Sequence, residues 1–401
     1  MTPKVKERIE QIRHGQVPKG YQVTRSGIVP SDWTMFRIDD CLERVEHPVK
    51  VQADKLYTQI GIRSQGKGLC YKEQVTGAEL GNKAVFWIEP DCFILNIVFA
   101  WEQAIGKTTS AEKGMIGSHR FPMYRPINNR VDVDYLINYF LTKRGAEILE
   151  SASPGGAGRN KTLGQGRFLK SKVVLPSLAE HRKIAKILAT QDKVIELKEK
   201  RLVEKQRQKK YLAKQVFSGM KSVVPLCELA LITMGQSPSS ETYNTSFNGV
   251  PLIQGNADIS NRKTFPRMYT TSPTKICSPG DILISVRAPV GTVARSTISA
   301  CIGRGICSIR PKRMSDYIYE YLLYYEDKWG RVSQGSTFES ISGDDIGKLS
   351  IPQHQESDQV AKMLTFAGKE IDLLRQDVEQ EKRKKKALMQ LLLTGIVRVN
   401  V

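Results

Sequence analysis

Apolar residues recur every seven positions in two long, charged segments of the chain. Such spacing between charged flanks is typical of helices that pack along a long seam. Each segment follows a proline and ends at a glycine, as helix boundaries do, which predicts helices of about 40 residues and roughly 60 Å. Lys209 and Lys385 take the next heptad position, where we expect the seam to end or loosen. The residues expected to pack the helices together are Ile184, Leu188, Ile195, Leu202, Leu364, Ile371 and Val378.

The two segments are copies of one another. Residues 175–223 align with residues 351–399 without a gap, and 14 of the 49 aligned positions are identical. The regions before them repeat more faintly, and the offset between matching positions drifts in order from 189 through 185, 182 and 180 to 176. An ordered drift is what duplicated domains with different loop lengths produce.

The remainder of each copy alternates short β-type runs with Gly, Pro, Asn and Ser. LYTQIGI, AVFWI, FILNIVF, KVVL, DILISV and GICSIRP are such runs, whereas VDYLINYFLTKRGAEIL and SDYIYEYLLYYEDKW have helical periodicity. We therefore expect an α+β protein with two tandem mixed α/β domains and two long helices. The predicted parts are an N-terminal helical arm (1–27), a first domain (28–175), a central helix (176–222), a second domain (223–350) and a C-terminal helix (351–401).

Charge is the first indication of a partner. The chain of 401 residues has 61 Lys and Arg against 41 Asp and Glu, a formal charge of +20, which favours a polyanionic partner, nucleic acid before membrane. No run approaches the ~20 apolar residues that span a bilayer, and the charged N-terminal residues lack the apolar region of a signal peptide. Seven cysteines in no tight cluster fit reduced thiols in the cytoplasm.

The usual catalytic patterns are absent from the sequence. IGKTT (105–109) resembles the end of a phosphate-binding loop, but Trp101 stands where the first glycine is required. The five histidines lack metal-ligand spacing, and Cys301 and Cys307 have no second pair, so packing is their expected role. Glu196 and Lys198 have a nuclease-like spacing but lie within the heptad pattern. We therefore expect no catalytic residues and no metal site.

Binding chemistry remains. Glycine-flanked loops carry side chains that can donate to phosphates and read base edges. Ordinary solvated loop residues are an equally good interpretation of any one of them. As a set, the predicted DNA-binding residues are Gln59, Arg63, Lys67, Lys107, Thr108, Arg159, Asn160 and Lys161 in the first domain, and Gln236, Ser237, Gln254, Asn256, Arg262, Arg287, Arg304 and Ser336 in the second.

With these residues in view, the sequence resembles the specificity (S) subunit of type I restriction–modification enzymes over nearly its whole length. The resemblance is carried by IVPSDW (28–33), GQSP (235–238), SPGDILISVRAPVGTVA (278–294) and the proline-led helices at Pro176 and Pro352. Such subunits usually have a Glu-Gln pair near each helix start. Here the pairs are Glu180-His181 and Glu356-Ser357, so this chain departs from the family pattern at the second residue of each pair.

The resemblance implies two target recognition domains that each read one half of a split, asymmetric site on double-stranded DNA. It also implies that the two helices pair as an antiparallel coiled coil and set the spacer. Two methylation (M) subunits, and restriction (R) subunits where present, would be partners. They would use S-adenosylmethionine, ATP and Mg, whereas this chain would hold no cofactor.

Two other hypotheses stay open at this point. A self-contained DNA-modifying enzyme with an unrecognised site would modify or cut DNA by itself. A two-domain scaffold or regulator would bind DNA without any methyltransferase companion.

Overall fold

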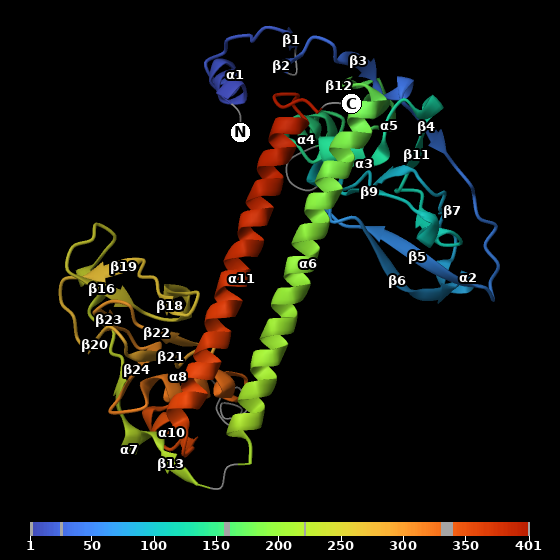
Figure 1. Ribbon diagram of the computed structural model, residues 1–401. Coiled ribbons are helices and arrows are strands. Elements are labelled where there is room, and N and C mark those ends of the chain that lie inside the picture. The colour runs from blue at the N-terminus through green and yellow to red at the C-terminus, as the bar shows by residue number, and fades with distance from the viewer. Residues whose placement is uncertain (1–2, 25–26, 156–160, 220–221, 330–339, 400–401) are drawn as a thin grey trace. The chain divides into compact units, whose positions relative to one another are not determined.

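The computed structural model describes residues 3–24, 27–155, 161–219, 222–329 and 340–399. The chain divides into two compact units (Figure 1). Unit 1 comprises the chain up to Leu197 together with the segment from Val378 onward, and unit 2 comprises Lys198–Asp377. Two long helices, α6 (Leu178–Phe217) and α11 (Ser357–Leu392), contribute one part to each unit. Each unit is therefore a mixed α/β domain with part of both helices.

Unit 1 contains two four-stranded sheets, with strand orders β4-β11-β8-β9 and β6-β5-β10-β7. Their strands are β4 (Leu42–Val45), β5 (Leu56–Ile62), β6 (Leu69–Thr76), β7 (Val85–Trp87), β8 (Phe93–Leu95), β9 (Ile105–Lys107), β10 (Ile116–Ser118) and β11 (Met123–Pro126). Two small antiparallel pairs join β1 (Tyr21–Thr24) with β2 (Gly27–Pro30) and β3 (Thr34–Arg37) with β12 (Lys172–Leu175). The helices are α1 (Pro3–Arg13), α2 (Gly77–Leu80), α3 (Val133–Phe140), α4 (Lys143–Ser151) and α5 (Gln165–Lys170).

Unit 2 contains a six-stranded sheet of order β14-β24-β21-β22-β18-β17 and a five-stranded sheet of order β15-β19-β16-β23-β20. Their strands are β14 (Ala230–Met234), β15 (Tyr243–Asn244), β16 (Val250–Ile253), β17 (Ile259–Ser260), β18 (Lys263–Thr264), β19 (Met268–Thr270), β20 (Ile276–Cys277), β21 (Ile282–Ser285), β22 (Val293–Arg295), β23 (Ala300–Ile302) and β24 (Ile306–Pro311). A small pair joins β13 (Val223–Pro225) with β25 (Ser350–Pro352). The helices are α7 (Leu226–Leu229), α8 (Ser315–Tyr325) and α10 (Gly343–Gly347).

The sheets of the two units share one topology. The order β4-β11-β8-β9 corresponds to β14-β24-β21-β22, and β6-β5-β10-β7 corresponds to β19-β16-β23-β20. In each case the second sheet has a parallel pair at the same place, β5 with β10 and β16 with β23, in an otherwise antiparallel sheet. The duplication seen in the sequence is therefore a duplication of fold.

One helix in each unit fills the same core position. Tyr135, Tyr139 and Phe140 of α3 are buried in the core of unit 1. The matching residues of α8 in unit 2 are Tyr317, Tyr321 and Leu322, which are buried as well. These apolar and aromatic faces bind each helix to its sheet.

The predicted runs correspond closely to elements, with two corrections to helix bounds. The periodic run 133–149 is two helices, because Asp132 and Thr142 each cap a separate N-terminus by accepting from the backbone N–H of Tyr135 and Gly145. The second long helix starts at Ser357 rather than at 351, because Ser350–Pro352 pairs with β13 instead.

The two long helices pair antiparallel in each unit. In unit 1, Gln191 donates to the Glu381 carboxylate at 2.7 Å and Asp192 pairs with Lys385 at 2.6 Å. In unit 2, Lys198 pairs with Asp377 at 2.8 Å, and Lys205 pairs with Glu370 at 3.0 Å. Partners in α11 move toward its N-terminus as positions in α6 move toward the C-terminus, which defines the antiparallel direction.

The heptad positions are mostly removed from solvent. Leu202 is half-buried, and the other six predicted packing residues are buried: Ile184, Leu188, Ile195, Leu364, Ile371 and Val378. The next heptad positions do not simply loosen. Lys385 pairs with Asp192 across the seam, and Lys209 pairs at 2.8 Å with Glu320 of α8, a side chain only 4% exposed.

Candidate nucleic-acid interface

Three loops of unit 2 meet at one end of its sheets. They follow β14, follow β16 and connect β23 with β24, and they carry Gln236, Ser237, Gln254 and Arg304, which we name the loop cluster of unit 2. The Ser237 hydroxyl accepts from the Arg304 backbone N–H at 3.2 Å. The Gln236 N–H donates to the Ile302 carbonyl at 2.9 Å. Four predicted DNA-binding residues, distant in sequence, are thus neighbours.

Glycines permit the close approach of these loops. A Cβ atom on Gly305 would lie 2.3 Å from the carbonyl oxygen of Gln254, and one on Gly235 would lie 2.2 Å from the carbonyl oxygen of Gly303. Neither contact leaves room for a side chain, so both positions require glycine for packing rather than for an unusual φ. The loops can therefore bring backbone and side chains within reach of a common ligand.

The side chains of the cluster suit base edges. Arg304 and Gln236 are exposed and Gln254 is half-buried. Arginine matches the two acceptors of guanine, and glutamine matches the donor and acceptor of adenine. Arg287 lies beside the cluster, because the Val286 N–H donates to the Gly305 carbonyl at 2.9 Å. No acidic side chain in the described parts of the chain pairs with Arg304 or Arg287.

Arg262 lies elsewhere in unit 2. It lines a cavity of about 760 Å³ between its turn, α8 and the unit 2 parts of the long helices. Its guanidinium forms a two-pronged ion pair with Glu326, with one contact of 2.7 Å. Burial by itself would lower the pKa of Arg262, but Glu326 raises it overall. The structure therefore gives Arg262 a role in holding the β17–β18 turn, and does not bring it to the loop cluster. Asn256 is half-buried and lines the same cavity, although it lies only two residues after Gln254.

Unit 1 has a loop that corresponds to the Arg304 loop. His119 and Arg120 lie in the connection between β10 and β11, as Gly303, Arg304 and Gly305 connect β23 with β24. The Arg120 carbonyl accepts from the Ile97 N–H at 3.0 Å, in the position of the Gly305–Val286 bond.

His119 and Arg120 are exposed, and both were missed as predicted site residues. The repeat gives only a partial signal, because the match of IGSHR (116–120) with IGRGI (302–306) has an offset of 186, outside the ordered drift, and places Ser118 rather than Arg120 opposite Arg304.

The predicted residues of unit 1 are more scattered. Arg63 and Lys67 are exposed on the β5–β6 turn, where the Arg63 guanidinium donates to the Lys67 carbonyl at 2.6 Å. Lys161 pairs with Glu150 at 2.9 Å and lies over the Trp101 ring. Gln59 is not in a loop, since it is half-buried within β5 opposite Ile116.

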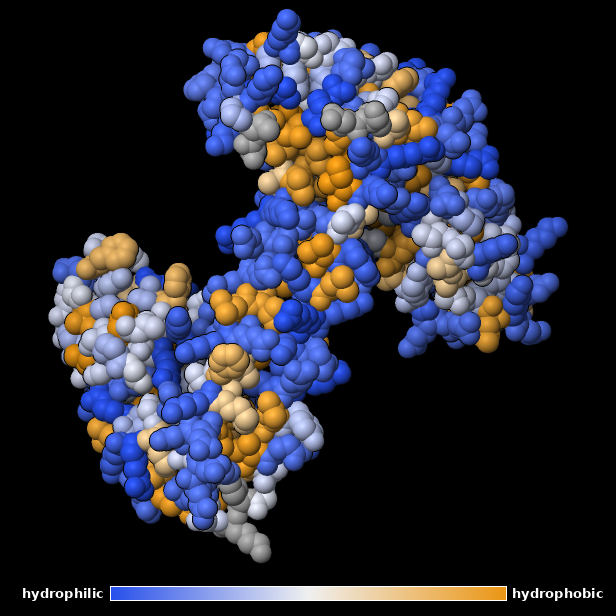
Figure 2. All heavy atoms as spheres, in the orientation of Figure 1, coloured by the Kyte–Doolittle hydropathy of each residue, from blue (hydrophilic) through white to orange (hydrophobic). Residues whose placement is uncertain are grey.

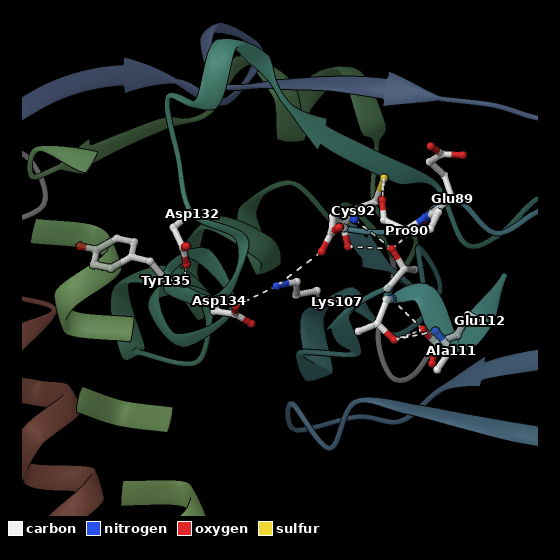
Figure 3. A network of polar contacts seen from close by, with 12 residues as sticks. Glu89, Pro90, Cys92, Lys107, Ala111, Glu112, Asp132, Asp134 and Tyr135 are labelled. Atoms are coloured by element: carbon white, nitrogen blue, oxygen red, sulfur yellow. Dashed lines mark hydrogen bonds and ion pairs between the residues drawn. The ribbon is translucent and has the colours of Figure 1, made fainter. Parts of the chain in front are cut away.

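Two further predictions in unit 1 need correction. Figure 3 shows Lys107 directed toward Asp134, which it contacts at 2.9 Å, and Asp91 lies 3.8 Å away. Burial by itself would lower the pKa of Lys107, but these carboxylates raise it overall. Thr108 is fully buried, and its hydroxyl donates to the Glu89 carbonyl at 2.6 Å. Thr108 therefore joins two turns and cannot reach DNA, and Lys107 is already neutralised by acidic neighbours.

Three predicted residues, Arg159, Asn160 and Ser336, lie outside the described residues. All the others stay predictions as DNA contacts, apart from the corrections above.

A buried polar network closes the helix end of unit 1. The Glu180 carboxylate is 1% exposed and receives the Arg398 guanidinium at 2.8 Å, while Arg398 also contacts Asp32 at 2.8 Å. His181 beside it is buried and stacks on Tyr135 with ring centroids 4.2 Å apart. Burial lowers the pKa of His181 to about 4, so the imidazole is neutral at physiological pH. This network joins the last segment of the chain to the start of α6.

Other chemistry is sparse in the described residues. All seven cysteines carry free thiols, and Cys301 and Cys307 are buried in the core of unit 2 as expected. Burial raises the pKa of the Cys307 thiol to about 12. Within the described ranges, no three His, Cys, Asp or Glu side chains gather as a metal site would require. None of the described helices combines the length and apolar character needed to cross a membrane.

Comparison with known proteins identifies the family. The model of the type I restriction modification DNA specificity domain matches residues 30–205 and 219–381. The type I restriction enzyme MjaX specificity subunit of Methanocaldococcus jannaschii is 30% identical, over 95% of this chain and 97% of the relative. The MjaVIII specificity subunit of the same organism is 23% identical, over 92% and 94%.

Solved structures share the fold. A chain from a study of complex assembly and conformational transition of the type I R-M system superimposes with a TM-score of 0.64 at 22% identity, covering 92% of this chain and 99% of that one. The type I S subunit from M. genitalium superimposes with a TM-score of 0.56 at 14% identity, covering 92% and 97%. The chain, with its two matching domains, therefore belongs to the specificity subunits of type I restriction–modification systems, the non-catalytic DNA-recognition component of such enzymes.

Proposed function

We propose that the chain recognises a bipartite, asymmetric DNA sequence, with each unit reading one half. The observation that carries this proposal is the pair of corresponding loops with different side chains. Unit 2 presents Arg304 between β23 and β24, while unit 1 presents His119 and Arg120 between β10 and β11. Because base identity is read by side-chain hydrogen bonds, different loops in the same fold position read different bases.

The helix pair is proposed to set the spacer between the two half-sites. α6 has 40 residues and α11 has 36, and ion pairs join them in both units. At 1.5 Å per residue these helices are roughly 60 and 54 Å long, which exceeds the ~34 Å of one turn of DNA. A stiff element of fixed length restricts the number of base pairs between half-sites.

The chemistry is proposed to come from partners in the cytoplasm. Two methylation subunits would dock on this chain and use S-adenosylmethionine to methylate adenine, and restriction subunits would add ATP- and Mg-dependent cleavage. The support is family membership, together with a chain whose exposed polar residues suit binding. This chain would then supply the DNA sequence specificity of the complex, and the partner subunits would supply catalysis.

Methylation mapping tests the proposal. DNA is sequenced by a single-molecule method from cells expressing this chain with its neighbouring methyltransferase, and from cells with the methyltransferase alone. We expect a split, adenine-methylated motif that requires both proteins. Methylation without this chain, or a continuous motif, would contradict the proposal and favour a scaffold.

Variants then assign the half-sites. Arg304→Ala is expected to relax one base of one half-site and Arg120→Ala one base of the other, each weakening discrimination by about 10- to 100-fold. Arg313→Ala is the matched control, because Arg313 is exposed but follows the opposite end of β24, and this six-residue strand of about 20 Å separates it from Arg304. Relaxation of both halves by either variant would argue against one half-site per unit.

A further inference from the structure

One exposed phenyl ring in unit 2 is held in a strained position. Phe247 lies in the loop between β15 and β16, and 76% of its surface is exposed. Its φ is 60°, in the left-handed region that non-glycine residues rarely adopt. A strained, solvent-exposed phenyl contributes little to folding, and such strain tends to occur at functional sites.

Hydrogen bonds define the loop that carries Phe247. The Asn244 amide nitrogen donates to the Asn248 carbonyl at 2.8 Å, and its amide oxygen accepts from the Asn248 N–H at 3.0 Å. The Ser246 hydroxyl donates to the same amide oxygen at 3.2 Å. The Phe247 ring lies with its centroid 5.0 Å from that of Tyr269. These hydrogen bonds and the contact with Tyr269 therefore give the exposed ring a defined position.

The ring lies one short strand away from the loop cluster of unit 2, because Phe247 precedes the four-residue strand β16 and Gln254 follows it. Tyr269 on β19 is opposite Pro251 of β16, and Pro251 is three residues before Gln254. Three residues of strand span about 10 Å, close to three base-pair steps of ~3.4 Å. The Tyr243 hydroxyl also donates to the Pro238 carbonyl at 3.2 Å, which joins the start of β15 to the GQSP loop. Figure 2 shows apolar atoms projecting from the part of unit 2 where Figure 1 draws β16 and β19.

We propose that Phe247 is a wedge that stacks against the bases of the half-site read by unit 2 and unstacks one base step there. Proteins that bend or open DNA insert phenylalanine and other apolar side chains in this way. The inference rests on the proposed function and adds DNA distortion to base reading.

The described part of unit 1 has no counterpart of this wedge. The edge strand of its second sheet is β6, which corresponds to β19 of unit 2. Among the described strands, unit 1 therefore has no equivalent of β15. Two of its described aromatic residues are exposed. The Tyr71 hydroxyl donates to the Glu112 carboxylate, and Phe99, which is 36% exposed, has an ordinary φ of −125° and lies outside the second sheet. The distortion is therefore predicted in one half-site only.

The test uses the full chain assembled with its methyltransferase subunits. Duplexes carry the mapped methylation motif, with 2-aminopurine in place of single adenines in the half-site that Arg304→Ala relaxes. 2-Aminopurine fluorescence rises when the base loses its stacking partners. The wild-type complex should raise the fluorescence at one position next to the wedge. In the other half-site, this chain should not unstack a base, so it should cause no such rise.

Phe247→Asn is the key variant, because asparagine tolerates the left-handed backbone without supplying a ring. It should abolish the fluorescence rise and weaken binding to the motif by about tenfold, within the range of one aromatic–base stack. Phe247→Trp should restore both. Phe366→Ala is the matched control, since Phe366 is 73% exposed but lies on α11, and it should change neither.

Three results would overturn the wedge. Unchanged fluorescence and affinity in Phe247→Asn, with the split motif intact, would overturn it and leave the proposed function standing. A melting temperature lowered by several degrees would show that the ring serves packing. A wild-type complex that methylates no split motif would overturn the proposed function and the wedge together.

Discussion

Unit 1 and unit 2 share a fold but differ in the polar contacts of their helices. In unit 1, Lys385 of α11 pairs with Asp192 of α6 across the helix seam. The repeat places Lys209 and Gly368 at the same two positions in unit 2, and a Cβ on Gly368 would lie 2.9 Å from the Lys209 amine. With no carboxylate at that position, Lys209 pairs instead with Glu320 of α8. The same lysine thus joins helix to helix in one unit and helix to domain in the other.

The helix starts differ in a similar way. Glu180 is buried with Arg398, whereas Glu356 at the equivalent position in unit 2 is exposed. Buried His181 corresponds to Ser357, which is half-buried. Apolar positions therefore preserve the fold in both copies, while the polar contacts of the helices have diverged.

The largest effect is expected at the helix seam. Ile195→Asp places a carboxylate at a buried position of unit 1 and should lower the free energy of unfolding by roughly 3–5 kcal/mol. Leu202→Asp in unit 2 should cost less, because Leu202 is only half-buried. Thermal unfolding measures both. Leu197→Asp is the control, since Leu197 is 55% exposed and its change should be close to neutral. An unchanged melting temperature for Ile195→Asp would contradict the seam.

A smaller effect is expected from the two heptad lysines, and it should be unequal. Lys209→Met leaves the nearly buried Glu320 carboxylate with Thr365 at 3.3 Å and should cost about 3 kcal/mol. Lys385→Met leaves Asp192, whose side chain is 50% exposed, and should cost less than about 1 kcal/mol. Urea unfolding of the two variants gives the comparison. Adding Glu320→Gln to Lys209→Met should recover most of the loss, and equal costs for the two lysine variants would refute the difference between the units.

The smallest effect is a pH dependence confined to unit 1. The pKa of His181 is lowered by burial to about 4, from 6.5 in an ordinary histidine. Between these values the unfolded chain binds the proton and the folded chain does not, so stability is complete above pH 6.5 and falls as the pH drops toward 4. The loss should reach roughly 2 kcal/mol by pH 5.

Melting temperatures measured from pH 7.5 to 5 test this expectation. His181→Ser, which introduces the residue found at the equivalent position of unit 2, should remove the part of the pH dependence that His181 causes in that range. A profile that is the same with and without His181 would show that other groups control the pH dependence.

The long helices, several strands and the family could be predicted from the sequence, because they depend on the order of residues that are close together in the chain. The gapless repeat, the heptads and the run LYTQIGI predicted α6, α11 and β5. The family resemblance, carried by motifs in a particular order, is confirmed by a matching family model over both domains. Composition and periodicity are properties of neighbouring residues, so they survive without knowledge of the fold.

Tertiary structure decided which side chains meet. Gln254 and Arg304 become neighbours only because β16 pairs in parallel with β23, and strand pairing joins residues that are distant in sequence. Thr108 was predicted to be a hydrogen-bond donor in an exposed loop, but it is buried and donates to the carbonyl of Glu89 in another turn. Arg262 forms an ion pair with Glu326, which is distant in sequence. His119 and Arg120 became candidates only because the sheet places their connection, between β10 and β11, at the position of the Arg304 loop. The sequence by itself determined the repeated elements and the family, whereas exposure and convergence at the predicted DNA-binding loops depend on contacts between distant segments.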